Sequence, residues 1–576
     1  MPRARLPSNG ALLVCLGLLG VVLATYATSL GNAPVWDDRP LVVDNPSLGS
    51  LAGIGRIWST DLWSASAQGD ASSYYRPFTM LTFWVNVALG GRSSISLHLG
   101  NVLIHAANVI LLWLYARRST AKRSARSAGL VALLFAVAPV CSEPVLWISG
   151  RFDLLVVTFA LLALLASRKD GHVGTALALG AIAVGLLCKE SFVAWVPMLL
   201  VHDLLVRRVA ARSLLAKYLA VAAIGAAYLA LRALLGIPSV EVLKDMSVRS
   251  FGQSFLFLVA TFLRELVWPT TLDPFRPYEV LEGGALLATL IALAALVVAP
   301  VASVWRRPEN ERARVAVVGV AWFVLTTLPS VVVGPSLAMV GDRYAYLPLV
   351  GLFIAVAALL SELEERFPSG WRIGAALGAS VAVTGAVVTG AVVTALHARD
   401  WRSDRALAAS SLASDPENPY ALYWLGSEAA QHGHLDEADD LLARSMARNP
   451  GSWRTWNAVC YLRLHQMRVG EAEAACLRSI GLQPKNPRAW LNLASVYVRG
   501  ERWKDALPAA ERALALHPSM VEAHYIAGVS AANLGLYDAA EAHVRDGLAV
   551  DPTHPRLLSF KADLERTRRE RPPPAP

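Results

Sequence analysis

Two adjacent carboxylates, Asp37 and Asp38, stand a few residues after the first long apolar run of the chain. A general base needs a carboxylate within about 3 Å of the proton that it removes, and an adjacent acid raises the pKa of its neighbour or orients the acceptor. The pair therefore indicates acid–base chemistry at a membrane surface. The same dipeptide, followed by Arg39-Pro40, also suits a solvated turn, and by itself it leaves both interpretations open.

Further ionisable and aromatic side chains stand beside later apolar runs. The cationic residues are Arg76, Arg151, Lys189 and Arg343. The acidic and aromatic residues are Tyr75, Glu143, Asp153, Glu190, Asp342 and Tyr344. Taken one at a time, such residues also serve as ion pairs or as anchors that snorkel to the membrane surface. Because a simple topology brings them all to one face, we expect a polar site there whose cations stabilise an anionic leaving group.

Within the second apolar run, four polar residues follow helical spacing: His98, Asn101, His105 and Asn108. They lie on one face of the expected helix. A polar stripe inside a membrane helix must face a cavity or another helix, so two interpretations remain. The stripe lines a substrate cavity, or it forms hydrogen bonds between helices.

The elements that position these residues are mostly apolar. The chain has 576 residues, of which 55% are hydrophobic and 17% charged, and this composition excludes a soluble enzyme of ordinary kind. Its net charge of +9 comes from short basic clusters between apolar runs, which favours topology signals over nucleic-acid binding. We therefore expect an all-α protein with a polytopic membrane part.

Eleven apolar runs are long enough to be read as spans of about 20 residues. They cover approximately 10–30, 97–116, 128–145, 152–167, 173–189, 191–206, 214–235, 284–304, 313–333, 344–361 and 372–396. The first run also fits a cleaved signal peptide, but we expect an uncleaved span because further spans follow. The stretch Phe251 to Trp268 carries Arg264-Glu265, and we expect it to be a re-entrant or interfacial helix. With the N-terminus inside, the basic clusters fall on the cytoplasmic side and the C-terminal part lies outside.

Five prolines, Pro416, Pro450, Pro484, Pro518 and Pro552, recur every 34 residues, the period of tetratricopeptide repeats. The sequence predicts a membrane domain over 1–398 with its first outer loop at 31–96, a repeat array over 399–570 and a disordered tail at 571–576. The array is expected to hold a half-repeat at Asp404 to Ser414, four full repeats and a closing helix at Arg556 to Arg569. A solenoid of this kind can hold an extended polypeptide on its concave surface.

Cysteines are few. Cys15, Cys141 and Cys188 lie in apolar runs, where they are expected to be inert core residues. Cys460 and Cys476 fall on the two helices of one repeat, where an extracytoplasmic location permits a disulfide without requiring one. The sequence contains no recognisable metal-ligand spacing, so we assign no metal site, and a role for a divalent metal stays open.

The order of several motifs resembles the transmembrane and tetratricopeptide-repeat O-mannosyltransferases and their bacterial relatives. These motifs are Trp36-Asp-Asp, Tyr75-Arg-Pro-Phe, His98-Leu-Gly-Asn-Val-Leu-Ile-His, the segment from Phe135 to Val145, Ser149-Gly-Arg-Phe-Asp, Cys188-Lys-Glu, Asp342-Arg-Tyr-Ala-Tyr-Leu-Pro and Arg399-Asp-Trp. The resemblance covers nearly the whole chain. It implies a GT-C glycosyltransferase architecture and a polyprenyl-phosphate sugar donor used on the outer face of a bacterial cytoplasmic membrane. The stretch Gly236 to Val280 lacks a loop pattern associated with animal members, which leaves the choice of acceptor open.

Carried over to this chain, the resemblance implies that Asp37 is the base and that Asp38 supports it. It also implies direct displacement with inversion, no covalent sugar intermediate, and generally no metal. We therefore expect transfer of a sugar, with mannose the leading candidate, to Ser or Thr hydroxyls of extracytoplasmic proteins docked by the array. Two alternatives remain: a catalytically inactive membrane-anchored scaffold for envelope proteins, and a glycosyltransferase that acts on lipid or polysaccharide.

Overall fold

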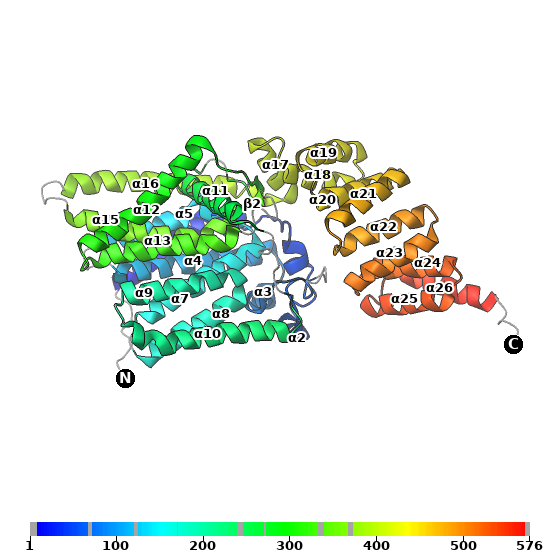
Figure 1. Ribbon diagram of the computed structural model, residues 1–576, viewed down its shortest axis with the longest axis horizontal. Helices are drawn as coiled ribbons and strands as arrows, with labels where there is room; N and C mark the ends of the chain where they lie inside the picture. Colours follow the sequence, from blue (N-terminus) through cyan, green and yellow to red (C-terminus); the bar gives the residue numbers. More distant parts are fainter. Residues whose placement is uncertain are drawn as a thin grey trace. The chain divides into compact units, whose positions relative to one another are not determined.

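The structure is a computed structural model that describes residues 9–66, 72–119, 125–169, 171–238, 246–269, 272–331, 339–366 and 372–570 (Figure 1). The tail expected at 571–576 lies outside the described residues. The chain divides into two compact units between Ser410 and Ser411. Both units are helical, and each is described by itself.

The first unit is a bundle of long apolar helices, with two-residue strands β1 (Arg276–Pro277) and β2 (Met339–Val340) paired antiparallel. Its longer helices are α1 (Asn9–Tyr26), α3 (Pro77–Gly90), α4 (Ser94–Ser119), α5 (Ala125–Val137), α7 (Arg151–Ser167), α8 (His172–Cys188), α9 (Val196–Leu205), α10 (Ala211–Leu234), α11 (Val248–Val267), α12 (Gly283–Arg306), α13 (Glu311–Val331), α15 (Tyr346–Arg366) and α16 (Arg372–His397). Two shorter helices, α2 (Leu51–Ser59) and α6 (Glu143–Leu146), lie in the connections.

Among the described residues, nine helices are long and apolar enough to cross a membrane, so the protein is an integral membrane protein. Eleven spans were expected. Three of those segments form α5, α8 and α9, which have 13, 17 and 10 residues and are not among the nine. Helix α11, expected to be interfacial, is one of the nine by length and composition.

Burial separates the core of the bundle from its surface. About 83% of the span that contains α7 is buried inside the protein, against 11% for α10 and for α12. Helices α13 and α15 cross closely at two glycines, because a Cβ on Gly319 would lie 2.4 Å from the carbonyl oxygen of Gly351. Trp322 in α13 donates to the carbonyl of Leu347 at the same crossing. Helices α7, α13 and α15 therefore form the core of the bundle.

The second unit is a tetratricopeptide-repeat array, as predicted. Helix α17 (Asp404–Ser414) begins in the first unit and ends in the second. Four helix pairs follow: α18 (Pro419–Gln431) with α19 (Leu435–Arg448), α20 (Trp453–His465) with α21 (Val469–Leu482), α22 (Pro487–Arg499) with α23 (Trp503–Leu516), and α24 (Val521–Asn533) with α25 (Tyr537–Val550). Helix α26 (Pro555–Glu570) closes the array.

Small residues let the helices of a pair approach each other. A Cβ on Gly426 would lie 2.8 Å from a side-chain carbon of Leu442, so α18 and α19 meet too closely there for a larger residue. Ala438, Ala472, Ala506 and Ala540 are all fully buried in the second helices of the pairs. Cys460 and Cys476 form a disulfide between α20 and α21, with their Cα atoms 5.1 Å apart.

Candidate functional site

Asp38, in the loop after α1, accepts hydrogen bonds that connect this loop to Ser149 in the turn before α7. Its carboxylate is fully buried and accepts three hydrogen bonds, from the Val35 amide at 3.1 Å and from the amide and hydroxyl of Ser149, each at 2.7 Å. Burial raises the pKa of Asp38 to about 7, with a smaller contribution from the charge of Asp37, while the three donors oppose the shift. Asp38 therefore ties the backbone of this loop to Ser149.

Asp37 is half-buried, and its charge acts on Tyr74 as well as on Asp38. The pKa of Tyr74 is raised, chiefly by burial, and Asp37, Glu190 and Tyr344 add to the shift. Tyr74 lies under the guanidinium of Arg76, with 4.6 Å between the guanidinium carbon and the ring centroid. Tyr74 therefore links Asp37 to Arg76, because both residues act on it electrostatically.

The first of these charged residues is Arg76, at the start of α3. Its Nε donates to Glu190 at 3.0 Å, and the other oxygen of Glu190 accepts the Tyr75 amide at 2.7 Å. The hydroxyl of Tyr75 donates to the carbonyl of Trp58 at 2.9 Å, so Tyr75 supports the backbone of this segment. Glu190 is the second residue after α8, and it therefore joins the start of α3 to the end of α8.

Two further cations, like Arg76, each pair with one carboxylate of another segment. Lys189 pairs with Asp153 of α7 at 2.5 Å, and Arg343 pairs with Glu143 of α6 at 2.5 Å. The amide of Arg343 also donates to Glu143, at 2.9 Å. Tyr344 lies between the two cations, with its ring centroid 4.7 Å from the guanidinium of Arg343 and 5.7 Å from Lys189 Nζ.

Arg76, Lys189 and Arg343 form one group, here called the cation cluster. The pKa of Lys189 is lowered, mainly by burial, and the charges of both arginines act in the same direction while Asp153 opposes them. All three side chains are largely buried, with 11 to 13% of their surface exposed. Three cations from separate segments are therefore held close together by three carboxylates.

Asp342 lies beside the cation cluster in a second network. It accepts from Arg276 at 2.8 Å and from the Asp273 amide at 3.1 Å, and Arg276 also pairs with Glu265 at 3.1 Å. Sequence reasoning missed Arg276, Asp273 and the role of Glu265. The available signal in the sequence was Glu265, an acid within the apolar run that forms α11.

Arg151 has a different environment from the cation cluster. It donates to the side-chain oxygens of Asn101 at 2.8 Å and Asn86 at 2.7 Å, and its guanidinium lies 4.0 Å from the ring centroid of Phe83. These partners lie on α4 and α3, so Arg151 joins α7 to both helices. The geometry favours a packing role for Arg151 over donor binding.

The polar stripe on α4 mainly forms contacts between helices. Asn101 donates to the carbonyl of Trp147 at 2.8 Å, His105 Nδ1 lies 2.7 Å from the hydroxyl of Tyr346, and Asn108 donates to the carbonyl of Leu154 at 2.9 Å. His98 is buried on the same face. Of the two interpretations of the stripe, the structure favours interhelical hydrogen bonding.

Trp36, which directly precedes Asp37, was noted from the sequence only as part of the motif Trp36-Asp-Asp and was given no role. Its φ of +51° lies in the left-handed region that a bulky residue rarely adopts. Its amide donates to Asp404 at 2.9 Å, and its ring packs edge-on against Trp147, Phe275 and Trp401 at centroid distances of 4.8 to 5.6 Å. The segment after α16 therefore holds the aspartate loop in a strained conformation.

The same segment holds the start of the loop. Asn32 donates from its side chain to the carbonyl of Ala398 at 2.8 Å, and the Ala33 amide donates to the carbonyl of Arg402 at 3.2 Å. The motif Arg399-Asp-Trp was noted only for its resemblance. Nothing in its composition or spacing indicates a contact with a loop more than 360 residues away.

No group of three or more His, Cys, Asp or Glu side chains is arranged to hold a metal ion within the ranges that the structure describes. Glu143, Asp153, Glu190 and Asp342 each pair with an arginine or a lysine.

Comparisons with known proteins find similarity in both parts of the chain. A family profile described as "Tetratricopeptide repeat" matches residues 491–555. Protein O-mannosyl-transferase F38B6.6 of Caenorhabditis elegans is 23% identical over 73% of this chain and 61% of its own length. Protein O-mannosyl-transferase TMTC4 of Homo sapiens is 26% identical over 76% of this chain and 66% of its own length.

The chain thus spans less than two thirds of the length of these curated relatives. Among solved structures, a thermophilic tetratricopeptide-repeat protein of Thermus thermophilus, TTC0263, matches 30% of this chain and 93% of its own, with 20% identity and a TM-score of 0.26. That score is too low to carry an argument. The sequence matches carry the assignment: the protein is a homologue of the TMTC protein O-mannosyl-transferases, with a tetratricopeptide-repeat region after its membrane part.

Proposed function

We propose that the protein is a membrane glycosyltransferase that moves a sugar, with mannose the first candidate, from a polyprenyl-phosphate donor to Ser or Thr hydroxyls of a protein. Homology to protein O-mannosyl-transferases supports transfer of a sugar to protein. The observation that carries the proposal for this chain is that Asp37 and Arg76 of the cation cluster both act electrostatically on Tyr74. A base and an anion-binding group within one site are what such a transfer requires.

In the proposed reaction, Asp37 takes the proton from the acceptor hydroxyl as its oxygen attacks the anomeric carbon of the donor. The bond between that carbon and the phosphate oxygen breaks, and the polyprenyl phosphate leaves with both electrons. The new bond forms on the opposite side of the sugar ring, so the anomeric configuration inverts. No covalent bond to the protein is needed, because one displacement completes the transfer.

The cation cluster would stabilise the leaving phosphate. Charge grows on the phosphate as its bond to the sugar breaks, and fixed cations in a water-poor site stabilise that charge most effectively. Arg76, Lys189 and Arg343 are each held by one carboxylate, so they are ordered before the donor arrives. Arg151, which binds neutral oxygens on α3 and α4, is better assigned to packing.

We further propose that the repeat array binds the protein acceptor and raises its concentration near the site. This requires the array and the site to be on the same side of the membrane, with the N-terminus in the cytoplasm and the array outside it. Two observations support that topology. The basic clusters between the first apolar runs favour a cytoplasmic N-terminus, and a disulfide within the array suits an oxidising compartment.

The test is sugar transfer by the purified full-length protein. Synthetic polyprenyl-phosphate mannose carrying a radiolabel is incubated with an extract of extracytoplasmic proteins, and the products are separated into protein and lipid. Label in protein that resists lipid extraction and is released as mannose by β-elimination supports the proposal. Label in lipid alone would favour a lipid glycosyltransferase, and no transfer from any polyprenyl-phosphate sugar would favour an inactive scaffold.

A further inference from the structure

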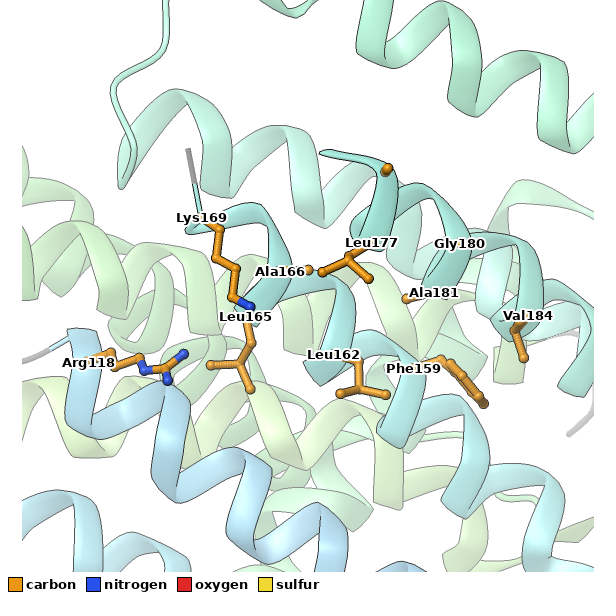
Figure 2. Close-up of a pocket in the computed structure, with 11 residues that line it drawn as sticks. Arg118, Phe159, Leu162, Leu165, Ala166, Lys169, Leu177, Gly180, Ala181 and Val184 are labelled. Atoms are coloured by element: carbon orange, nitrogen blue, oxygen red, sulfur yellow. The ribbon is translucent and has the colours of Figure 1, made fainter. Parts of the chain in front are cut away.

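Away from the candidate site, α7 and α8 form an open groove of about 510 Å³ on the surface of the first unit (Figure 2). The residues of α7 that line it include Phe159, Leu162 and Ala166, spaced by three and four positions. Helix α8 contributes Leu177 and Val184 among others. Because this spacing places each set on one helical face, the groove runs along both helices.

Small side chains on α8 create the hollow. Gly180 lines the groove, and a Cβ placed on Gly180 would meet no atom within 4 Å. Leu162 and Leu177 remain 37% and 50% exposed beside it, although each is a large apolar residue. In a protein that spans a membrane, hydrocarbon chains of lipids are the natural cover for such a surface.

One end of the groove is cationic. Figure 2 shows the side chains of Arg118 and Lys169 together at one end, with Val184 at the other. Neither cation has a carboxylate partner among the residues for which the structure gives contacts. Arg168 donates to the carbonyl of Arg118 at 2.9 Å and to the Ser119 hydroxyl at 3.1 Å, which fixes the end of α4 against the end of α7.

This end is far along both helices from the candidate site. Helix α7 begins at Arg151 and ends at Ser167, next to Lys169, whereas α8 begins at His172 and ends at Cys188, next to Lys189 of the cation cluster. Each helix has 17 residues, about 25 Å of length at 1.5 Å per residue. A phosphate held by Arg118 and Lys169 is therefore separate from the proposed donor phosphate.

We propose that this groove binds an anionic glycerophospholipid of the surrounding membrane, with its phosphate between Arg118 and Lys169 and an acyl chain along α7 and α8 over Gly180. Charge complementarity selects an anionic head group over a zwitterionic one, since Arg118 and Lys169 lie at this end and neither pairs with an acid among the described residues. The proposal concerns a lipid ligand and does not depend on the glycosyltransferase activity.

The test is native mass spectrometry of the detergent-purified full-length protein with equimolar phosphatidylglycerol and phosphatidylcholine of identical acyl chains. We expect the wild type to retain phosphatidylglycerol preferentially. The double variant Arg118→Gln/Lys169→Gln should lose roughly tenfold in that preference. Gly180→Leu should reduce binding of both lipids, since its side chain fills open space without a clash. The double variant Arg212→Gln/Arg306→Gln removes two exposed arginines outside the groove and should behave as wild type.

Melting temperatures of all variants would show that each remains folded. Equal retention of the two phospholipids by the wild type would overturn the proposal, as would unchanged binding in Gly180→Leu. A third arm adds polyprenyl phosphate. If it displaces phosphatidylglycerol from the wild type at lower concentration than phosphatidylglycerol itself, the groove is a site for the carrier lipid and the proposal is wrong.

Discussion

The amide of Trp36 donates a hydrogen bond to the carboxylate of Asp404 at 2.9 Å, across 368 positions of sequence. Trp36 is the residue before the proposed base, and Asp404 is the first residue of α17, the helix that leads into the repeat array. The start of that helix and the aspartate loop therefore share one contact. A change at Asp404 acts directly on the residue next to Asp37.

Loss of this contact should lower activity without weakening donor binding. In Asp404→Ala the Trp36 amide loses its acceptor, and the left-handed conformation of Trp36, which costs on the order of 1–3 kcal/mol, loses part of its support. We expect kcat to fall roughly tenfold with the KM for the donor nearly unchanged, because a small displacement of a base is enough to slow the reaction. Steady-state kinetics at varied donor concentration measure both values.

Asp404→Asn is the matched control, because its side-chain oxygen can still accept from Trp36. It should keep most of the wild-type kcat. Asp436→Ala, an exposed acid in the first turn of α19, should have no effect. The contact has no positioning role if Asp404→Asn and Asp404→Ala lose kcat equally.

Replacement of Lys189 should change the KM for the donor, whereas replacement of Arg151 should change the stability of the protein. Lys189→Gln removes a charge from the cation cluster while keeping a donor for Asp153, so we expect the KM for the donor to rise at least about tenfold. Arg151→Met leaves the oxygens of Asn101 and Asn86 without their donor, at about 1–3 kcal/mol each. It should lower the melting temperature by several degrees and change the donor KM little. A rise in donor KM for Arg151→Met, without loss of stability, would show that Arg151 binds the donor and would contradict the packing role.

Much of this architecture follows from local sequence. The 34-residue period of prolines predicts every helix pair of the array, because each repeat is one local unit that packs on its neighbours. Apolar runs likewise locate the membrane helices. The expected spans at α8 and α9 are helices of only 17 and 10 residues. Between them, Lys189 and the 3-10 segment Glu190–Trp195 interrupt the apolar run, and this segment contributes Glu190 to the site.

The features that could not be predicted depend on contacts between residues that are far apart in the sequence. The spacing of Asn101, His105 and Asn108 gives their common face, but it does not say whether water or another helix lies opposite. The role of Arg151 depends on Asn86 and Asn101, which no local pattern connects to it. The contact between Trp36 and Asp404 depends on the path of the whole membrane unit.

The stability of the protein should depend on pH through Asp38. Burial raises its pKa from the ordinary 3.8 to about 7, so the folded state binds this proton more tightly than the unfolded state. The stability from that proton is complete below pH 3.8 and is lost as the pH rises to about 7. Between pH 5 and pH 8 the wild type should lose about 3 kcal/mol relative to Asp38→Asn, which does not titrate. Melting temperatures of both proteins at the two pH values test this, and an equal difference at both values would contradict it.

Removal of the array should separate acceptor binding from donor chemistry. The truncation must end after Ser414, because Trp401 and Asp404 hold the aspartate loop and belong to the first unit. We expect hydrolysis of the donor to be retained and transfer to protein to fall at least about tenfold, through loss of effective acceptor concentration. A truncation before Trp401 is the comparison, and it should lose both rates. Equal loss of both rates in the longer form would argue against docking by the array.

The most direct test of the central claim is transfer of radiolabelled mannose from polyprenyl phosphate to protein by Asp37→Asn and by Asp44→Asn. Asp44 is an exposed acid in the same loop and serves as the matched control. Because general-base catalysis is worth about 100-fold to 10,000-fold, Asp37→Asn should lose at least about 100-fold in transfer at an unchanged melting temperature, and Asp44→Asn should match the wild type. Wild-type transfer by Asp37→Asn would show that another group removes the proton and would contradict the account.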